Sequence, residues 1–286
     1  MRFCKEFEDF ELIDVNGGER LERFGNVILV RPDPQIIWKS SIDKRLWNRA
    51  QAVYKRSASG GGYWEMLEAL PESWQIKYKE FIFNLKPMGF KHMGIFPEQA
   101  VNWEFLRKII KPGMNVLNLF AYTGAASVVA AKFGAKVTHV DASRGMVAFA
   151  KENAASNGIS NIRWIVEDCL KFVHREIRRK NKYDGIIMDP PSYGRGPNGE
   201  VWKLEDNLQE LIVSTGKLMN EEAKFFMLNT YTAGISGEIL KFLCRQHLPK
   251  GQLFYDEIGL QVTKRDLLLP CGSTTIWTKD SNGKYY

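Results

Sequence analysis

From residue 114 onward, short apolar runs alternate with longer stretches that repeat apolar residues at helical spacing. The expected strands are Met114–Phe120, Lys136–Val140, Ile162–Val166, Tyr183–Met188 and Lys224–Leu228. The expected helices are Ala125–Phe133, Arg144–Asn157, Leu170–Arg179, Leu204–Met219 and a helix near Ile235–Gln246. Strands that alternate with helices form βαβ units, so the pattern predicts an α/β domain with a mostly parallel, Rossmann-like sheet. Two further stretches, Leu253–Val262 and Thr274–Lys279, predict a closing antiparallel hairpin.

The first 85 residues follow a different pattern. Glu11–Asp14 and Asn26–Val30 are short apolar runs on either side of a turn-rich centre with two adjacent glycines, which predicts short antiparallel strands. Apolar and aromatic residues within Tyr78–Leu85 predict another strand that leads into the larger domain. We therefore expect a small β-rich accessory domain over residues 1–85 and the α/β domain over residues 86–286.

Composition narrows the class of protein. Hydrophobic residues at 44% and charged residues at 26% are ordinary for a globular chain. The chain has no apolar run near the ~20 residues that cross a bilayer, and the N-terminus lacks the apolar core of a signal peptide. The four cysteines are scattered without paired spacing, which argues against a zinc site and a disulfide framework. We expect a cytoplasmic protein with no metal.

The chain is basic, with a formal net charge of +7 and a pI of about 9.1. Most of this excess lies in residues 100–286, so it belongs to the larger domain and not to a detachable arm. Such a charge permits binding to RNA or DNA but does not require it.

The first predicted strand of the larger domain ends in Phe120-Ala121-Tyr122-Thr123-Gly124, and a helix of small residues follows. Strand, tight turn and helix form the phosphate-binding arrangement of dinucleotide folds, but the motif G-x-G-x-x-G needs three glycines and this turn has one. Without the other two glycines the turn is not built to bind a pyrophosphate, which argues against NAD. It favours a nucleoside without phosphate, for which S-adenosylmethionine (SAM) is the candidate. The alternative is that Gly124 ends an ordinary strand–helix turn.

Acidic residues follow the second and third predicted strands. Asp141 is placed to accept hydrogen bonds from both ribose hydroxyls, as the acid after strand two does in dinucleotide folds. Its alternative role is a helix N-cap, although Ser143 is available to cap the helix instead. Asp168 is placed either to accept from the adenine amino group or to cap the helix that follows it.

The fourth predicted strand runs into Asp189-Pro190-Pro191-Ser192-Tyr193. The two prolines fix the backbone, because each locks φ and removes a donor. Asp189 and the neighbouring carbonyls are then able to accept hydrogen bonds from an amino group or the edge of a heterocycle, and Tyr193 offers a ring for stacking. The alternative is that the prolines merely end the strand.

These residues carry a family resemblance. The segment Asn115–Tyr193 is similar to class I SAM-dependent methyltransferases, whose fourth-strand motif is (D/N)PP(Y/F); here Ser192 places the aromatic residue one position late. Lys91–Gln99 resembles the segment that precedes this domain in methyltransferases acting on large-subunit ribosomal RNA and in their relatives of unassigned substrate. Residues 1–85 resemble the accessory β-domain of one bacterial branch.

The resemblance implies SAM as the cofactor and a base of ribosomal RNA as the methyl acceptor. It places the segment before the domain over the cofactor, so Phe96 and Gln99 join the candidate contacts. The complete set of candidate cofactor residues is Phe96, Gln99, Asn118, Phe120, Tyr122, Thr123, Gly124, Asp141, Ser143 and Asp168. The candidate catalytic residues are Asp189, Pro190, Pro191, Ser192 and Tyr193.

Several members of the family that this chain resembles make 5-methylcytosine with a cysteine nucleophile. This cysteine has to lie beside the base. The usual positions follow strands four and five, and here they hold no cysteine. Cys271, near the closing hairpin, is the remaining candidate, although a buried thiol without function is the other interpretation. We therefore expect methyl transfer to a nitrogen in preference to cytosine C5.

Two basic runs bear on RNA binding. Residues 39–56 mix basic with aromatic side chains, which suits either phosphate contact with base stacking or an amphipathic helix with its aromatics in the core. The run from Lys171 to Lys182 is typical of a solvated helix face, and a docking site for nucleic acid is the alternative. Two other functions stay open, namely a methyltransferase for a protein glutamine or a small metabolite, and a non-catalytic RNA-binding factor with this fold.

Overall fold

The computed structural model describes residues 1–39, 41–57, 61–195, 201–232 and 234–279. The chain divides into two compact units: unit 1 holds residues 1–2, 101–258 and 271 onward, and unit 2 holds residues 3–100 and 259–270. The sequence predicts the main boundary after residue 85, whereas the units divide after residue 100. A segment of the closing hairpin, residues 259–270, also belongs to unit 2.

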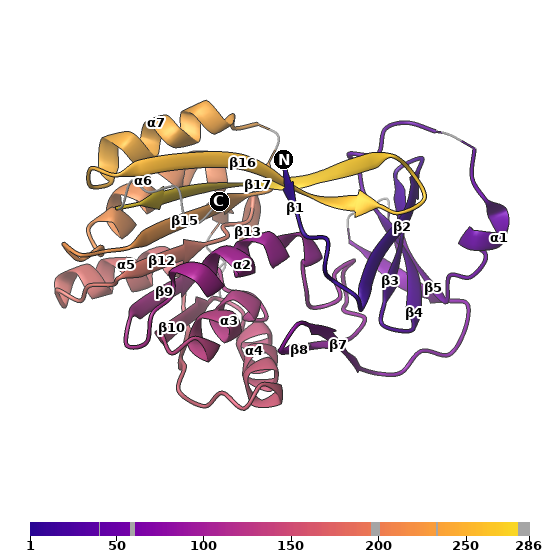
Figure 1. The fold of residues 1–286 in the computed structure, drawn as a ribbon, viewed down its shortest axis with the longest axis horizontal. Coiled ribbons are helices and arrows are strands. Elements are labelled where there is room, and N and C mark those ends of the chain that lie inside the picture. The colour runs from indigo at the N-terminus through magenta and orange to yellow at the C-terminus, as the bar shows by residue number, and fades with distance from the viewer. Residues whose placement is uncertain (40, 58–60, 196–200, 233, 280–286) are drawn as a thin grey trace. The chain divides into compact units, whose positions relative to one another are not determined.

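Unit 1 is built on a sheet with the strand order β11-β10-β9-β12-β15-β17-β16 (Figure 1). Its strands are β9 (Asn115–Leu119), β10 (Lys136–Asp141), β11 (Arg163–Val166), β12 (Gly185–Met188), β15 (Phe225–Thr230), β16 (Gln252–Val262) and β17 (Leu267–Thr278). Strands β9 to β12 and β15 are parallel to their neighbours, and β17 is antiparallel to β15. The predicted α/β class, with a mostly parallel sheet closed by an antiparallel hairpin, is confirmed.

Helices cover both faces of this sheet. They are α2 (Ala100–Ile109), α3 (Ala125–Lys132), α4 (Arg144–Ser156), α5 (Cys169–Arg178), α6 (Leu204–Gly216) and α7 (Gly237–His247). Successive residues of a strand point to opposite faces, and β15 shows both. Phe226 lies in a buried apolar cluster with Phe172 of α5 and Leu211 of α6. Its neighbour Phe225 faces the other way, where its ring meets that of Phe105 of α2 at 5.8 Å.

Unit 2 is rich in strands, as the sequence predicts. Its strands are β2 (Phe10–Asn16), β3 (Glu19–Phe24), β4 (Val27–Pro32), β5 (Ala52–Arg56), β6 (Gly62–Met66), β7 (Trp74–Tyr78) and β8 (Phe81–Leu85), and β1 (Arg2–Phe3) precedes them. The turn between β2 and β3 is formed by Gly17 and Gly18, with φ of 55° and 88°. Two-residue hairpin turns with positive φ at both positions favour glycine, which explains the pair.

Several short elements differ from the sequence prediction. Tyr78–Leu85 is not one strand but the turn and second arm of the β7–β8 hairpin, in which Lys79 has a φ of 50°. Helix α2 and the hairpin of β13 (Tyr193–Arg195) with β14 (Val201–Lys203) were not predicted. The remaining short elements are α1 (Lys44–Trp47) and a 3-10 turn at Pro97–Gln99.

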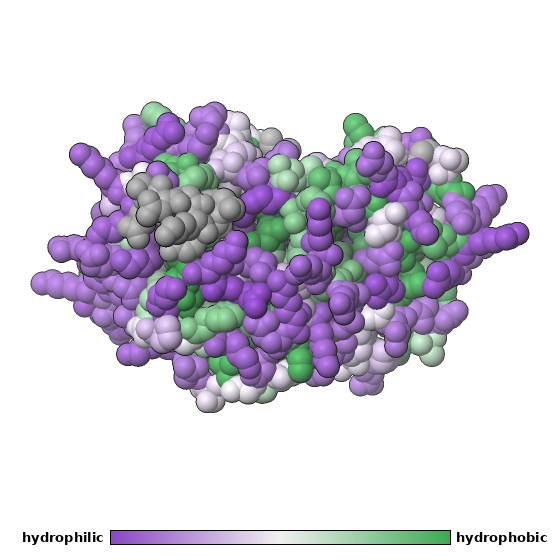
Figure 2. All heavy atoms as spheres, in the orientation of Figure 1, coloured by the Kyte–Doolittle hydropathy of each residue, from purple (hydrophilic) through white to green (hydrophobic). Residues whose placement is uncertain are grey.

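The visible surface is mixed in character. Figure 2 shows apolar side chains in separate patches among long hydrophilic ones. Among the residues that the structure describes, no helix is both long and apolar enough to cross a membrane.

Candidate active site

The carboxyl ends of the parallel strands in unit 1 lie in register at one edge of the sheet. Leu119, the last residue of β9, pairs with Val140 of β10 on one side and with Met188 of β12 on the other. Asp141 and Asp189 therefore follow on either side of the turn that leaves β9. Neighbouring strands are about 4.8 Å apart, so the two predicted acids flank this turn closely. In open α/β sheets this edge is where ligands bind.

The turn after β9 has an unusual backbone. Phe120, Tyr122 and Gly124 have φ of 53°, 50° and 81°, and the first two are residues that rarely adopt such values. A non-glycine residue in this conformation costs roughly 1–3 kcal/mol and persists where its surroundings hold it. The Phe120 N–H donates to Cys169 Sγ at 3.2 Å, and the Tyr122 N–H donates to Asp141 Oδ2 at 2.8 Å. Strain of this kind is typical of a functional site.

Asp141 links the turn to its own strand end. Its Oδ2 accepts from the Tyr122 N–H and its Oδ1 accepts from the Ser143 N–H, both at 2.8 Å. A carboxylate has about four lone-pair positions, so one on each oxygen is left for a further donor. Two vicinal ribose hydroxyls need this pair of acceptors, and the site therefore fits the nucleoside of SAM. Burial raises the pKa of Asp141, and the two backbone donors partly offset that effect.

Gly124 is required by both conformation and packing. A Cβ at this position would lie 2.9 Å from the Cβ of Ala150 on α4, and the φ of 81° is unfavourable for any other residue. On the other side of the turn, the buried amide of Asn153 donates to the carbonyl of Thr123 at 2.8 Å. The amide of Asn157, one helical turn later, donates to the Asn153 carbonyl at 2.7 Å. Helix α4 thus holds the end of the turn through both contact and hydrogen bonding.

Asn118 belongs to a buried network beneath the turn. Its side-chain amide donates to Ser127 Oγ at 2.9 Å, and that hydroxyl lies 3.0 Å from His139 Nδ1. Burial lowers the pKa of His139 to about 3, so its ring is neutral. The side chain of Asn118 fastens β9 to α3, and its predicted contact with the cofactor stays a prediction.

Two further candidates cap helices. Ser143 Oγ accepts from the Met146 N–H at 3.3 Å and caps α4, as the sequence allowed, so Asp141 does not have to. Asp168 Oδ1 accepts from the Lys171 N–H at 2.9 Å and caps α5. This cap is the alternative role that the sequence gave for Asp168. Contact of Asp168 with adenine and of Ser143 with the cofactor both stay predictions.

The Asp-Pro-Pro segment continues from β12 and turns away from the sheet. The Asp189 N–H donates to the Leu119 carbonyl at 3.4 Å, which extends the pairing of β12 with β9 by one residue. Pro190 is buried and Ser192 is exposed. Tyr193 is 55% exposed, and stacking of a base on its ring stays a prediction. The predicted catalytic roles of Asp189, Pro190, Pro191, Ser192 and Tyr193 stay predictions.

Trp202 supports this segment and was not identified from the sequence. Its indole N–H donates to the Pro191 carbonyl at 2.6 Å, and its ring lies 4.9 Å from that of Phe120. Leu204, where α6 begins, donates its N–H to the Ser192 carbonyl at 3.0 Å. The carbonyls of Pro191 and Ser192 thus already accept hydrogen bonds. The signal in the sequence is the alternation of Val201, Trp202 and Lys203, which is typical of a half-buried strand.

Asn229 is a second residue that the sequence analysis did not select. The register pairs Met188 with Leu228, so Asn229, near the end of β15, comes next to Asp189. Its Oδ1 accepts from Asn102 Nδ2 at 3.0 Å and from Thr274 Oγ1 at 2.8 Å. These buried bonds fix the strand end beside the Asp-Pro-Pro segment.

Cys169, Cys244 and Cys271 are buried, and Cys4 is half-buried. Burial raises the pKa of the Cys169 thiol well above its ordinary value, and it raises the pKa of Cys244 to about 12. Cys271 is 7% exposed, and Gly272 next to it packs against Tyr231, just past the end of β15. Cys271 therefore lies at the sheet edge where the parallel strands end.

Phe96 and Gln99 belong to unit 2. The ring of Phe96 lies 5.0 Å from that of His92, and the Gln99 N–H donates to the Phe96 carbonyl at 3.0 Å. Their contact with the cofactor stays a prediction.

In the first basic run, residues 39–56, Trp47 and Tyr54 pack inward. Trp47 packs against the small apolar cluster of unit 2, and its indole N–H donates to Asp14 Oδ2 at 2.8 Å. Tyr54 is 4% exposed and meets the ring of Trp64. Lys55 and Arg56 are exposed. The structure therefore packs Trp47 and Tyr54 inward, as the second interpretation expects. The predicted amphipathic helix is wrong, because Trp47 ends the short helix α1 and Tyr54 lies on strand β5.

The second basic run lies on α5 and the turn after it. Arg175 pairs with Glu167 at 2.6 Å, and Arg179 pairs with Glu176 at 3.4 Å. These cations have intramolecular partners, as the interpretation of a solvated helix face expects.

Comparison with known proteins identifies the family. The sequence profile of the S-adenosylmethionine-dependent methyltransferases matches residues 35–225. The crystal structure of a SAM-dependent methyltransferase from Agrobacterium tumefaciens is 36% identical, with a TM-score of 0.91, and the match covers 97% of this chain and 92% of that one. SMU.776, crystallised in complex with SAH, shares the fold at 21% identity, with a TM-score of 0.75 over 96% of this chain and 76% of that one.

A curated relative is the ribosomal RNA large subunit methyltransferase K/L of Shewanella frigidimarina (strain NCIMB 400). It is 34% identical over 167 residues, which are 57% of this chain and 22% of that protein. The chain thus spans less than a quarter of the length of the curated relatives it matches. The matched profile and the similarity along the whole chain to the Agrobacterium enzyme agree with the geometry of the turn and of Asp141: the chain belongs to the family of S-adenosylmethionine-dependent methyltransferases.

Proposed function

We propose that this protein transfers the methyl group of SAM to a base of ribosomal RNA, at a nitrogen atom in preference to cytosine C5. The observation that carries the proposal is the register that sets Asp141 and Asp189 on either side of the strained turn. One carboxylate that accepts hydrogen bonds from the ribose and another that accepts from the substrate thus lie beside one another. The choice of RNA is supported by the relative from Shewanella and by the net charge of +7.

One group of residues holds the cofactor, and another orients the methyl acceptor. Asp141 holds the ribose hydroxyls, and the turn from Phe120 to Gly124 brings backbone close to the methionine end. SAM supplies an electrophilic methyl group on a sulfonium sulfur, and its transfer to nitrogen releases SAH and one proton. Asp189 accepts a hydrogen bond from the N–H of the acceptor, which fixes the direction of the attacking lone pair.

The side chains near Asp189 favour nitrogen as the acceptor. A 5-methylcytosine mechanism needs a thiolate beside the base, and the segment after β12 and the end of β15 hold Ser192 and Asn229 instead of a cysteine. Cys169 has a raised pKa because it is buried, which is the opposite of what a nucleophile requires. Transfer to nitrogen needs no covalent intermediate, so Asp189 and its neighbours suffice.

The test is mass spectrometry of ribosomal RNA nucleosides from cells with and without this protein, together with methylation of the deficient RNA by purified protein and SAM. Loss of an N-methylated nucleoside, restored in vitro, is the expected result. Loss of 5-methylcytidine would refute the nitrogen assignment. If no rRNA nucleoside changes while calorimetry shows SAM binding, a protein or metabolite is the acceptor. If SAM does not bind, a non-catalytic RNA-binding role replaces the proposal.

A further inference from the structure

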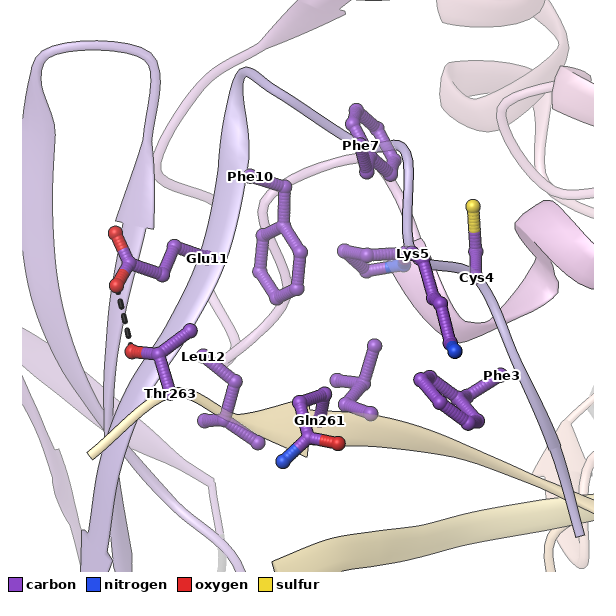
Figure 3. Close-up of a pocket in the computed structure, with 11 residues that line it drawn as sticks. Phe3, Cys4, Lys5, Phe7, Phe10, Glu11, Leu12, Gln261 and Thr263 are labelled. Atoms are coloured by element: carbon purple, nitrogen blue, oxygen red, sulfur yellow. Dashed lines mark hydrogen bonds between the residues drawn. The ribbon is translucent and has the colours of Figure 1, made fainter. Parts of the chain in front are cut away.

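Unit 2 contains a pocket of about 300 Å³ that the proposed methyl transfer does not use. It is lined by residues of the N-terminal segment 3–12, by Pro97 and by residues 260–263 of β16 and the turn after it (Figure 3). Ligand pockets range upward from roughly 300 Å³, so this one is suited to a single small group and not to a large ligand.

The inside of the pocket is aromatic and firmly packed. Phe7 and Phe10 are 7% and 8% exposed, and their ring centroids are 5.8 Å apart with an angle of 58° between the planes. Phe7 packs against Tyr78 at 4.9 Å and Phe10 packs against Phe24 at 5.0 Å, so both rings are held from behind. Phe3 adds a third aromatic ring to the lining, and Figure 3 shows it beside Lys5. These faces offer stacking contact to a planar ring.

Lys5 supplies a cation to the lining of the pocket. Lys5 is exposed, and its Nζ lies 5.4 Å from the centroid of the Phe3 ring. Within the described residues, no hydrogen bond or salt bridge to that ammonium is found. The nearest acid in the lining, Glu11, already accepts from Thr263 Oγ1 at 2.6 Å and from Arg23 Nε at 3.3 Å. The ammonium is therefore available to an anion brought by the ligand.

Gln261 adds a hydrogen-bond acceptor on the rim. Its Nε2 donates to the carbonyls of Val262 and Leu267, both at 3.3 Å. The two donations fix the orientation of the amide, and within the described residues its Oε1 receives no hydrogen bond. The pocket thus combines aromatic faces, one cation and one acceptor.

We propose that this pocket binds one unpaired nucleotide of the RNA substrate. The base stacks among Phe3, Phe7 and Phe10, its N–H edge donates to Gln261 Oε1, and an adjoining phosphate pairs with Lys5. An apolar side chain of a protein partner would fill the aromatic space but would leave both the ammonium and the amide oxygen without a partner. The inference rests on the proposed function, because it takes RNA as the substrate.

The experiment measures binding of a fluorescein-labelled single-stranded hexanucleotide to the full chain by anisotropy over a range of salt concentrations. The variants are Lys5→Glu and Phe3→Ala. The control is Lys77→Glu, which makes the same charge change at another exposed lysine of unit 2. Circular dichroism and SAM affinity verify that each variant is folded.

We expect Lys5→Glu to weaken binding about tenfold and to reduce the slope of log affinity against log salt by about 0.7, the effect of one phosphate contact on a single strand. Phe3→Ala should weaken binding about tenfold with little change in the slope, because base stacking is lost. Lys77→Glu should stay within about twofold of the wild type. In methylation assays KM for RNA should rise while kcat is retained.

Equal affinities for Lys5→Glu, Phe3→Ala and Lys77→Glu would overturn the proposal even if the wild type methylates RNA. Selective loss of binding in the first two variants, without RNA methylation by the wild type, would instead uphold the pocket and reject the proposed function. A titration with N-acetylphenylalanine amide covers the protein alternative. If that probe binds and Phe3→Ala abolishes its binding while RNA affinity is unchanged, the pocket belongs to a protein partner and the proposal is wrong.

Discussion

The carboxylate of Asp141 accepts a hydrogen bond of 2.8 Å from the backbone N–H of Tyr122, so the end of the second strand holds the turn that leaves the first. This bond stabilises Tyr122 in a left-handed conformation that a dinucleotide fold would give to glycine. The same carboxylate keeps a lone pair on each oxygen for the ribose. The side chain that shapes the turn is therefore also the one that we propose to hold the ribose.

Asp141→Asn should weaken SAM binding about 10- to 100-fold, because one charge-assisted acceptor becomes a donor. Isothermal titration calorimetry measures the change. Asp184→Asn is the matched control, since Asp184 accepts from the Asn115 N–H at 2.7 Å at the opposite end of the same strands. That control should leave SAM affinity unaltered. Equal losses in the two variants would show that the effect is general destabilisation of the sheet.

The same site predicts a pH dependence. Burial raises the folded pKa of Asp141 above its ordinary 3.8. The ribose needs the charged carboxylate, so SAM affinity should fall as pH is lowered through that raised value. Calorimetric titrations from neutral to acidic pH should show this decrease in the wild type, and Asp141→Asn should lack it.

Gly124→Ala should lower both stability and SAM affinity. The left-handed backbone alone costs about 1–2 kcal/mol with a side chain, and the new methyl would lie 2.9 Å from the Cβ of Ala150. The double variant Gly124→Ala with Ala150→Gly removes the clash but not the backbone cost. Urea unfolding of the wild type, both single variants and the double variant separates the two effects. A coupling free energy near zero between the two substitutions would mean that the protein relieves the clash without cost.

The sequence predicts the main strands of unit 1 and its helices α3 to α7 because each has a strong local pattern and a clear end. It also locates Asp141, Gly124 and the Asp-Pro-Pro segment, since each follows a strand directly. The hydrogen bonds that hold these segments in place come from partners far away in the sequence. Asn153 reaches the carbonyl of Thr123, 30 residues away, and Asn102 reaches Asn229, 127 residues away. No local spacing indicates such partners.

The missed elements have a similar cause. Val201 to Lys203 form only three residues of strand, too short for periodicity to separate from the helix that begins at Leu204. The hairpin of β7 and β8 turns at Lys79, which has a positive φ without being glycine, so the usual turn signal is absent.

Glu22→Gln should reduce stability by about 3–5 kcal/mol at neutral pH, because it breaks a buried ion pair and leaves its partner uncompensated. Arg31 donates to Glu22 Oε2 at 2.6 Å and to Oε1 at 2.9 Å, and the two side chains are 1% and 0% exposed. Urea unfolding measures the loss. Glu65→Gln is the control: its pair with Lys55 is about half exposed and should contribute less than about 1 kcal/mol.

This stabilisation by Glu22 depends on pH in a defined direction. Burial by itself would raise the pKa of Glu22, but Arg20 and Arg31 outweigh it, and the folded value lies below the ordinary 4.5. The contribution is therefore complete above about pH 4.5 and is lost as pH falls through the folded value. The difference between wild type and Glu22→Gln should narrow in acid. A difference that is constant down to the lowest pH would contradict a charged Glu22.

Cys271→Ser should leave turnover within about twofold if the acceptor is nitrogen, since no thiolate takes part. A 5-methylcytosine mechanism would instead lose activity by orders of magnitude. Single-turnover methylation of deficient rRNA distinguishes the two results. Cys244→Ser, which changes another buried thiol in unit 1, controls for the loss of packing. An inactive Cys271→Ser beside an active Cys244→Ser would restore the cysteine mechanism.

Asp189→Ala should reduce methylation by at least about 100-fold, the usual contribution of a group that takes a hydrogen bond or proton from the reacting atom. Its SAM affinity should stay within about threefold, because the residue proposed to hold the ribose is Asp141, on the other side of the turn. Asp189→Asn keeps one acceptor and should retain part of the activity, which a purely structural role would not predict. Calorimetry with SAM and methylation at saturating SAM, applied to Asp141→Asn and Asp189→Ala together, should therefore give opposite patterns. Full activity in Asp189→Ala would remove this residue from the reaction and leave the acceptor to be oriented by backbone carbonyls alone.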